Sequence, residues 1–295
     1  IHSKSDVFKR ETDVQDNKGI IFYDNEDTFR TKVIEAFKSS HFQDNENYSK
    51  VIAYTNSTVK YWNTLIREEI IGKNKRILEP GDLLMSYSNI LIAPDEQIFN
   101  SADYKVLKVR ETCNKHEIDV YEVTLEDIDN LEQFVIDFIV PTPHNIEKFK
   151  KTGNVLLDKA KSAFGKGRSA AWAMYYAYKS KHCLMSDIGP ISKDFDYGYA
   201  ITVHKSQGST YTNVFVDEGD IDTNKKYTER NKLKYVSFSR PTDTVHCLNI
   251  TIPAKRRATE AERLMIELWN KASNLEDTKE SILAIGKYLE HQKLI

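Results

Sequence analysis

The chain has 295 residues, with 42 basic and 44 acidic side chains and a net charge of −2 when the histidines are neutral. This length permits one large domain or two to three smaller ones, and the near balance of charge excludes uniform adhesion to nucleic acid, so any such contact must come from a local basic patch. No run of about 18 apolar residues and no signal peptide is present, which excludes a membrane-spanning helix. The three cysteines, Cys113, Cys183 and Cys247, suit neither a disulfide framework nor a zinc site and favour a reducing, cytoplasmic compartment.

Strands alternate with helices in residues 1–77. Residues 18–23 predict a buried strand, and Asn25 predicts the start of the helix that follows it. A second strand at 49–54 leads through Thr55 and Asn56 into another helix, which Gly72 ends. This order predicts an α/β fold with a parallel sheet and helices on its faces.

From Leu78 the pattern changes to short strands without helices between them. Strands are expected at residues 83–86, 104–110, 118–125 and 134–140, which is typical of a small antiparallel barrel or meander. A helical stretch is expected from residue 146 to about 184. Its aromatic side chains favour core packing over base stacking: Trp172, Tyr175, Tyr176 and Tyr178.

Basic side chains cluster in the same helical stretch. A nucleic-acid contact and a solvated face are both open readings for this cluster of Lys148, Lys150, Lys151, Lys159, Lys161, Lys166 and Arg168. A second, weaker candidate is the cluster Lys255, Arg256 and Arg257.

The alternating pattern resumes in residues 186–253, so a β-rich insert (78–185) interrupts one α/β domain. Strands are expected at 199–203, 213–216 and 244–250, with a helix at 227–239. An acidic run is expected to be a solvated loop rather than a metal site: Asp217, Glu218, Asp220 and Asp222. The apolar stripe of residues 254–295 predicts a C-terminal helical extension.

Two strings carry the chemistry. The first runs from Tyr199 to Thr210, where an apolar strand gives way to short polar side chains and then to Gly208. Phosphates of a single strand are held by such donors without sequence readout: Thr202, His204, Lys205, Ser206 and Gln207. The second runs from Lys234 to Pro241 and ends in Arg240, a planar cation suited to a transferring phosphoryl group.

These strings resemble motifs V and VI of superfamily 1 helicases, the UvrD-like C-terminal motifs, most closely in the Dda and RecD branch. Residues 51–56, which end in Asn56, are similar to the segment that opens the core of that family's second motor domain. The resemblance implies a RecA-like domain interrupted by an SH3-like insert, and 5′-to-3′ DNA unwinding in replication, repair or recombination. It implies that Arg240 and Gly208 face ATP and Mg²⁺, and that Asn56 and the motif V donors bind single-stranded DNA.

The phosphate loop Gly-x-x-x-x-Gly-Lys-Ser/Thr is not found in the sequence. We therefore expect an N-terminal motor domain to be missing, and the chain alone to be inactive. Two alternatives remain open. A non-catalytic nucleic-acid-binding module suits the missing loop but has no use for Arg240, and a viral-type RNA helicase shares similar motifs.

Overall fold

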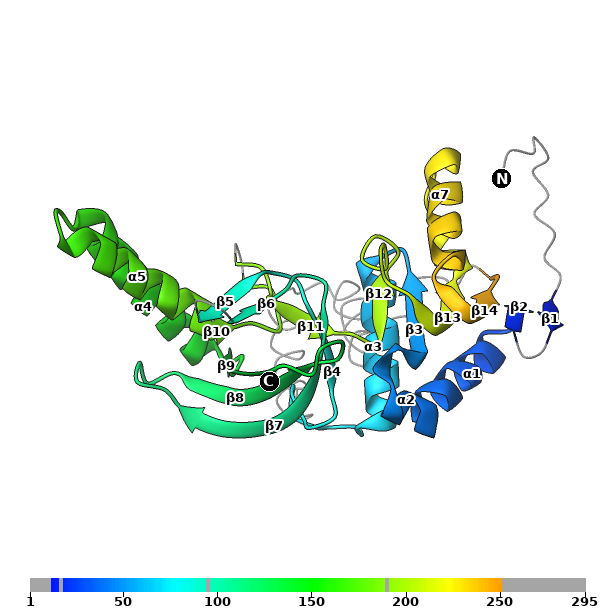
Figure 1. Cartoon of the computed structure of the whole chain (residues 1–295), viewed down its shortest axis with the longest axis horizontal. Coiled ribbons are helices and arrows are strands. Elements are labelled where there is room, and N and C mark those ends of the chain that lie inside the picture. Colours follow the sequence, from blue (N-terminus) through cyan, green and yellow to red (C-terminus); the bar gives the residue numbers. More distant parts are fainter. Residues whose placement is uncertain (1–11, 16–17, 94–95, 189–190, 251–295) are drawn as a thin grey trace, which may run out of the picture.

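The computed structural model describes residues 12–15, 18–93, 96–188 and 191–250, and the statements below concern these ranges. They form two separate six-stranded sheets and a small two-stranded hairpin. Figure 1 shows the two sheets side by side, with a pair of long helices extending beyond the second sheet. Within these ranges no helix combines the length and the apolar character that a bilayer crossing needs. The helices and the basic cluster expected in residues 254–295 lie outside the described residues.

The first sheet is parallel except at one edge, where β1 pairs antiparallel with β2. Its strands, in spatial order, are β1 (Asp13–Gln15), β2 (Lys18–Tyr23), β14 (Pro241–Leu248), β13 (Tyr211–Asp217), β3 (Ser49–Ala53) and β12 (Ala200–Thr202). β3 lies between β13 and β12, and all five of its residues are buried. A parallel sheet of this kind must be covered on both faces.

Helices cover both faces of this sheet. They are α1 (Glu26–Lys38), α2 (Ser40–Asp44), the 3-10 helix η1 (Glu46–Tyr48), α3 (Asn56–Ile70), α6 (Glu218–Ile221) and α7 (Tyr227–Phe238). On one face Val51 of β3 belongs to a core with Trp62 of α3. On the other face Ile52, the next residue, belongs to a core with Leu233 of α7. The alternation along β3 thus buries both faces, and it confirms the α/β class predicted from the sequence.

Local signals start and end the helices as the sequence predicts. The side chain of Asn25 caps α1 by accepting a hydrogen bond from Thr28 N, and Thr55 caps α3 in the same way through Thr58 N. Gly72 follows α3 with φ of 113°, a conformation that suits glycine.

The second sheet is antiparallel except where β10 pairs with β9. Its strands, in spatial order, are β10 (His182–Cys183), β9 (Gln133–Ile139), β8 (Asp119–Asp127), β7 (Asp103–Cys113), β4 (Leu83–Ser86) and β11 (Phe195–Tyr197). The hairpin β5 (Ile90–Ala93) and β6 (Glu96–Ile98) lies between β4 and β7 in the chain. Because β11 pairs with β4, this sheet extends past residue 185, where the sequence pattern placed the end of the insert.

A helical hairpin, α4 (Pro143–Ser162) and α5 (Gly167–Lys181), replaces the single helical stretch expected here. Gly165, with φ of 60°, lies in the turn between the two helices. Core packing was expected for the aromatic residues of α5, and it holds only for Tyr178, which is buried against Phe149 and Ile118. Tyr176 is 59% exposed, so for this residue the prediction was wrong.

Two buried ion pairs join the sheets. Lys50 of β3 contacts Asp103 of β7 at 2.7 Å, and Arg67 of α3 contacts Asp82 at 2.7 Å, just before β4. The hydroxyl of Tyr199 adds a bond of 3.3 Å to Asp82. The first sheet and the second sheet therefore share a buried polar junction.

Candidate functional site

The polar string of motif V begins at the carboxyl edge of the first sheet. Thr202, the last residue of β12, lies beside Ala53 at the end of β3, and the chain then turns tightly. Ser206 N donates to Thr202 O at 3.0 Å, and Lys205 N lies 3.3 Å from Thr202 Oγ1. Thr202 therefore shapes the turn with both its carbonyl and its hydroxyl.

The turn exposes some donors and buries another. His204 and Gln207 are exposed, whereas Ser206 is fully buried and donates its hydroxyl to Val203 O at 2.8 Å. The sequence predicts that Ser206 contacts a phosphate directly, but its hydroxyl donates its hydrogen bond within the turn. Gly208 is exposed with φ of 97°, so a side chain at this position would strain the return of the chain towards β13.

Asn56 lies at the same edge of the sheet, because β3 and β12 are parallel neighbours. It is the exposed first residue of α3. The N-terminus of α3 is held by the carboxylate of Asp220, which accepts hydrogen bonds from Tyr54 N, Thr55 N, Thr55 Oγ1 and Thr58 Oγ1 at 2.7 to 2.9 Å. A buried carboxylate at a helix N-terminus satisfies free amides and complements the helix dipole.

The acidic run was expected to be a solvated loop, and this prediction was wrong. Glu218 is fully buried and Asp220 is 2% exposed. Lys234 of α7 forms ion pairs with Glu218 at 2.6 Å and with Asp222 at 2.7 Å. The acidic run therefore helps to hold α7 against the first sheet. One sequence signal could have predicted this burial. The acidic run begins at the end of the buried strand β13, and residues there lie at the carboxyl edge of the first sheet, next to the ends of helices.

Lys205 does not project freely from the turn. Its Nζ donates to Asn100 Oδ1 at 2.8 Å and to Ser101 Oγ at 3.0 Å, and it lies 4.5 Å from the centre of the Tyr87 ring. Burial lowers the pKa of Lys205. These three contacts belong to the loops of the second sheet, so this lysine bridges the motif V turn to the insert.

Arg240 follows α7 and faces carbonyl and hydroxyl oxygens. Its Nε donates to Val236 O at 3.0 Å, its Nη2 to Ser239 Oγ at 2.8 Å, and its Nη1 to Ser209 O at 3.3 Å. Within the described ranges it forms no ion pair, so its charge is not neutralised by a carboxylate there. The bond to Ser209 connects Arg240 directly to the end of the motif V string.

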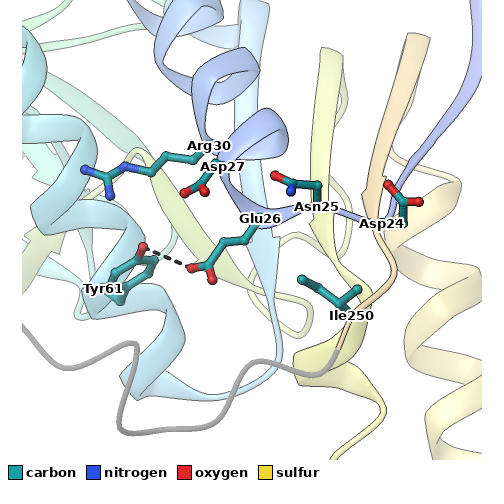
Figure 2. Close-up of a pocket in the computed structure, with 7 residues that line it drawn as sticks. All are labelled: Asp24, Asn25, Glu26, Asp27, Arg30, Tyr61 and Ile250. Carbon is teal, nitrogen blue, oxygen red and sulfur yellow. Dashed lines mark hydrogen bonds between the residues drawn. The ribbon is translucent and has the colours of Figure 1, made fainter.

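A pocket near the start of α1 has the wrong charge for a phosphate site. It is lined by Asp24, Asn25, Glu26, Asp27, Arg30, Tyr61 and Ile250, as Figure 2 shows. The lining contains three carboxylates and only one guanidinium, and Glu26 accepts a long bond of 3.4 Å from the Tyr61 hydroxyl. In the part of the chain that the structure describes, no group of three His, Cys, Asp or Glu side chains has the arrangement of a metal site.

Comparison with known proteins agrees with the motifs. Residues 197–258 match the model of the UvrD-like helicase C-terminal domain. An uncharacterised protein of Acanthamoeba polyphaga mimivirus is 23% identical over 280 residues, which cover 74% of this chain and 54% of that protein.

Solved structures with a similar arrangement include Pif1 helicase from Candida albicans, at 14% identity and a TM-score of 0.38, covering 84% of this chain and 54% of that one. Another is Pif1 helicase from Bacteroides in complex with ADP-AlF3 and ssDNA, at 12% identity and a TM-score of 0.33, covering 85% of this chain and 51% of that one. The chain thus spans about half the length of these relatives. The matched segment, residues 197–258, holds both motif strings, so this part of the chain is similar to the UvrD-like helicase C-terminal domain.

Proposed function

We propose that this chain is the C-terminal motor part of an ATP-dependent DNA helicase of the Dda and RecD type. Its complete form couples ATP hydrolysis to translocation on single-stranded DNA and to duplex unwinding. The observation that best supports this proposal is the hydrogen bond from Arg240 Nη1 to Ser209 O, because it connects the proposed nucleotide-facing cation to the proposed strand-binding turn. The cysteines, which form no disulfide within the described ranges, fit the cytoplasmic location that we propose with it.

The nucleotide side of the proposal depends on Arg240. A guanidinium held by neutral oxygens keeps its full charge for the phosphoryl group on which charge develops during transfer. The cradle for the other phosphates and the ligands for Mg²⁺ would come from an N-terminal motor domain, since the sequence contains no phosphate loop. We propose that Gly208 lies beside this cleft.

The strand side depends on the exposed donors at the carboxyl edge. His204, Gln207 and Asn56 are exposed there, and Thr202 and Ser206 set the shape of the turn. Neutral donors of this kind hold a phosphate backbone without reading its bases. Lys205 would add a cation to this edge if a strand displaced it from Asn100.

The division of the chain follows from this proposal. Residues 1–77 and 186–253, apart from β11, would form the motor domain, residues 78–185 together with β11 the insert, and residues 254–295 an extension. The alternative of a non-catalytic binding module is favoured only by the missing phosphate loop. For that module Arg240 would have no catalytic role.

The deciding experiment uses the complete protein with its N-terminal motor domain. Arg240→Ala should lower ATP turnover by about 10³-fold or more and leave single-strand affinity near normal, because the cation matters mainly in the transition state. Arg230→Ala is the matched control, since Arg230 lies on α7, the helix that precedes Arg240, and its Nε is 3.7 Å from Asp222 Oδ1. Loss of DNA binding with intact hydrolysis in Arg240→Ala would favour the binding module.

Variants of the turn test the strand side. His204→Ala or Gln207→Ala should weaken single-strand binding and the DNA stimulation of hydrolysis, with little change in salt slope, because neither neutral side chain displaces a counterion. Lys205→Ala should reduce the slope by about one unit if the lysine reaches a phosphate. The 295-residue chain alone should release no phosphate from ATP, and steady DNA-stimulated turnover by it would contradict the proposal.

A further inference from the structure

The outer half of the α4–α5 hairpin is a separate surface that the motor motifs do not use. Figure 1 shows the hairpin projecting from the second sheet, at the end of the molecule opposite α7. Its base is anchored, because Phe149 of α4 stacks on Tyr178 of α5 at 5.6 Å and the Tyr178 hydroxyl donates to Phe149 O at 3.0 Å. Both rings pack on the second sheet with Ile118 and Val120.

The hairpin concentrates positive charge. Residues 143–181 hold nine Lys and Arg side chains against Glu147 and Asp158, a net of +7, while the whole chain carries −2. At the base, Lys148 pairs with Glu117 and Lys181 with Asp137. Four exposed cations of the outer half, here called the tip cations, form no ion pair within the described ranges: Lys159, Lys161, Lys166 and Arg168.

Aromatic rings accompany the tip cations. Phe164, in the turn, is 86% exposed, and Tyr176 is 59% exposed. Trp172 is half-buried and stacks on Tyr176 with ring centroids 5.7 Å apart. Arg168, Trp172 and Tyr176 are each four residues apart, so they line one face of α5. We call Phe164, Trp172 and Tyr176 the tip aromatics.

The positive charge of this surface indicates which kind of ligand it binds. The partner must be anionic, and exposed rings between cations are the pattern on which bases stack while phosphates meet the cations. Residues 251–295 of the chain itself offer no such match, because they carry eight basic and seven acidic side chains.

We propose that the outer half of the α4–α5 hairpin is a second binding surface for single-stranded nucleic acid, where the tip cations hold phosphates and the tip aromatics stack on bases. The surface deepens the proposed function by taking the same class of ligand. It lies on different residues from the motif V turn, so the two can fail independently.

The test measures binding of the 295-residue chain to a labelled single-stranded oligonucleotide by fluorescence anisotropy over a series of salt concentrations. The variant Lys159→Ala/Lys161→Ala/Lys166→Ala should reduce the salt slope by up to about 2 units, at about 0.7 per phosphate contact. The matched control is Lys73→Ala/Lys75→Ala/Lys108→Ala, which removes the same charge from exposed lysines away from the hairpin and should leave the slope nearly unchanged. Phe164→Ala/Tyr176→Ala should weaken binding roughly 10-fold or more at every salt concentration, because stacking is lost without a charge.

Equal slopes in the tip and control variants would overturn the inference. So would loss of binding confined to His204→Ala/Gln207→Ala, which would leave the proposed function standing. Two further arms use a blunt duplex and vesicles that contain phosphatidylserine. If the tip variant loses binding to either of these while its single-strand binding is unchanged, the surface belongs to that ligand and the inference is wrong.

Discussion

Lys50→Met tests how the two sheets are held together. The ammonium of Lys50 is fully buried, 2.7 Å from Asp103 Oδ2 and 2.7 Å from Gly198 O. Methionine has a similar length and an apolar stem, so the substitution removes the charge and two hydrogen bonds but little packing. The buried carboxylate of Asp103 then has no cation, and its Oδ1 already lacks a hydrogen-bond partner within the described ranges.

The expected cost follows from this geometry. Breaking a buried ion pair by removing one partner costs about 3 to 5 kcal/mol, which is a large share of a typical stability of about 5 to 15 kcal/mol. Replacing both partners by apolar residues is often nearly neutral, so Lys50→Met/Asp103→Leu should recover most of the loss. Burial raises the pKa of Asp103, and protonation removes the uncompensated charge. The deficit of the single variant should therefore shrink as pH falls.

Urea denaturation of the wild type and the two variants measures these free energies of unfolding. Lys108→Met is the control, because Lys108 is exposed and such a change should stay within about 0.5 kcal/mol. A single variant that costs less than about 1 kcal/mol would refute the reasoning. The same holds for a double variant as unstable as the single one.

Two further predictions concern buried polar groups. Asp220→Ala should destabilise the fold by about 3 kcal/mol or more, because four donors around the start of α3 lose their acceptor. Asp220→Asn should cost less. Equal urea midpoints for the wild type and Asp220→Ala would contradict this prediction. Burial, with a smaller effect of Lys32, lowers the pKa of His246 to about 4 from its ordinary value of 6.5. The unfolded chain therefore takes up a proton first, and a contribution of up to about 3 kcal/mol, complete above pH 6.5, is lost as pH falls to about 4. His246→Phe, which keeps a ring stacked on Phe215, should remove this acid sensitivity, and an unchanged pH dependence of unfolding would show that another group is responsible.

Local signals in the sequence predict most of the fold. The helices after Asn25 and Thr55 begin at capping side chains, and the strands of the first sheet other than β1 are predicted from apolar runs. The strand β11 was not predicted, because its central residue is Asp196 and it lacks the apolar run that predicts β12, which is equally short. Its pairing with β4 depends on the fold as a whole.

The sequence proposes residues for the candidate site, but it does not show how their side chains are oriented. The motif strings identify Arg240 and the turn after β12. They give no sign that Lys205 turns towards Asn100, 105 residues away in the chain. Likewise, the burial of Asp220 depends on Thr55 and Thr58, more than 160 residues earlier. Such contacts between distant segments are set by tertiary packing and leave no local pattern.

The ion pairs between the two sheets link the position of the α4–α5 hairpin to that of the first sheet. Since the ion pairs Lys50–Asp103 and Arg67–Asp82 connect the second sheet to the first, a rotation of the first sheet carries the hairpin with it. α4 has 20 residues and is therefore about 30 Å long, so a rotation of about 10° about its base displaces the tip by about 5 Å. Under the proposed function, a nucleotide-driven rotation of this size at Arg240 would displace the tip of the hairpin by about the height of one helical turn.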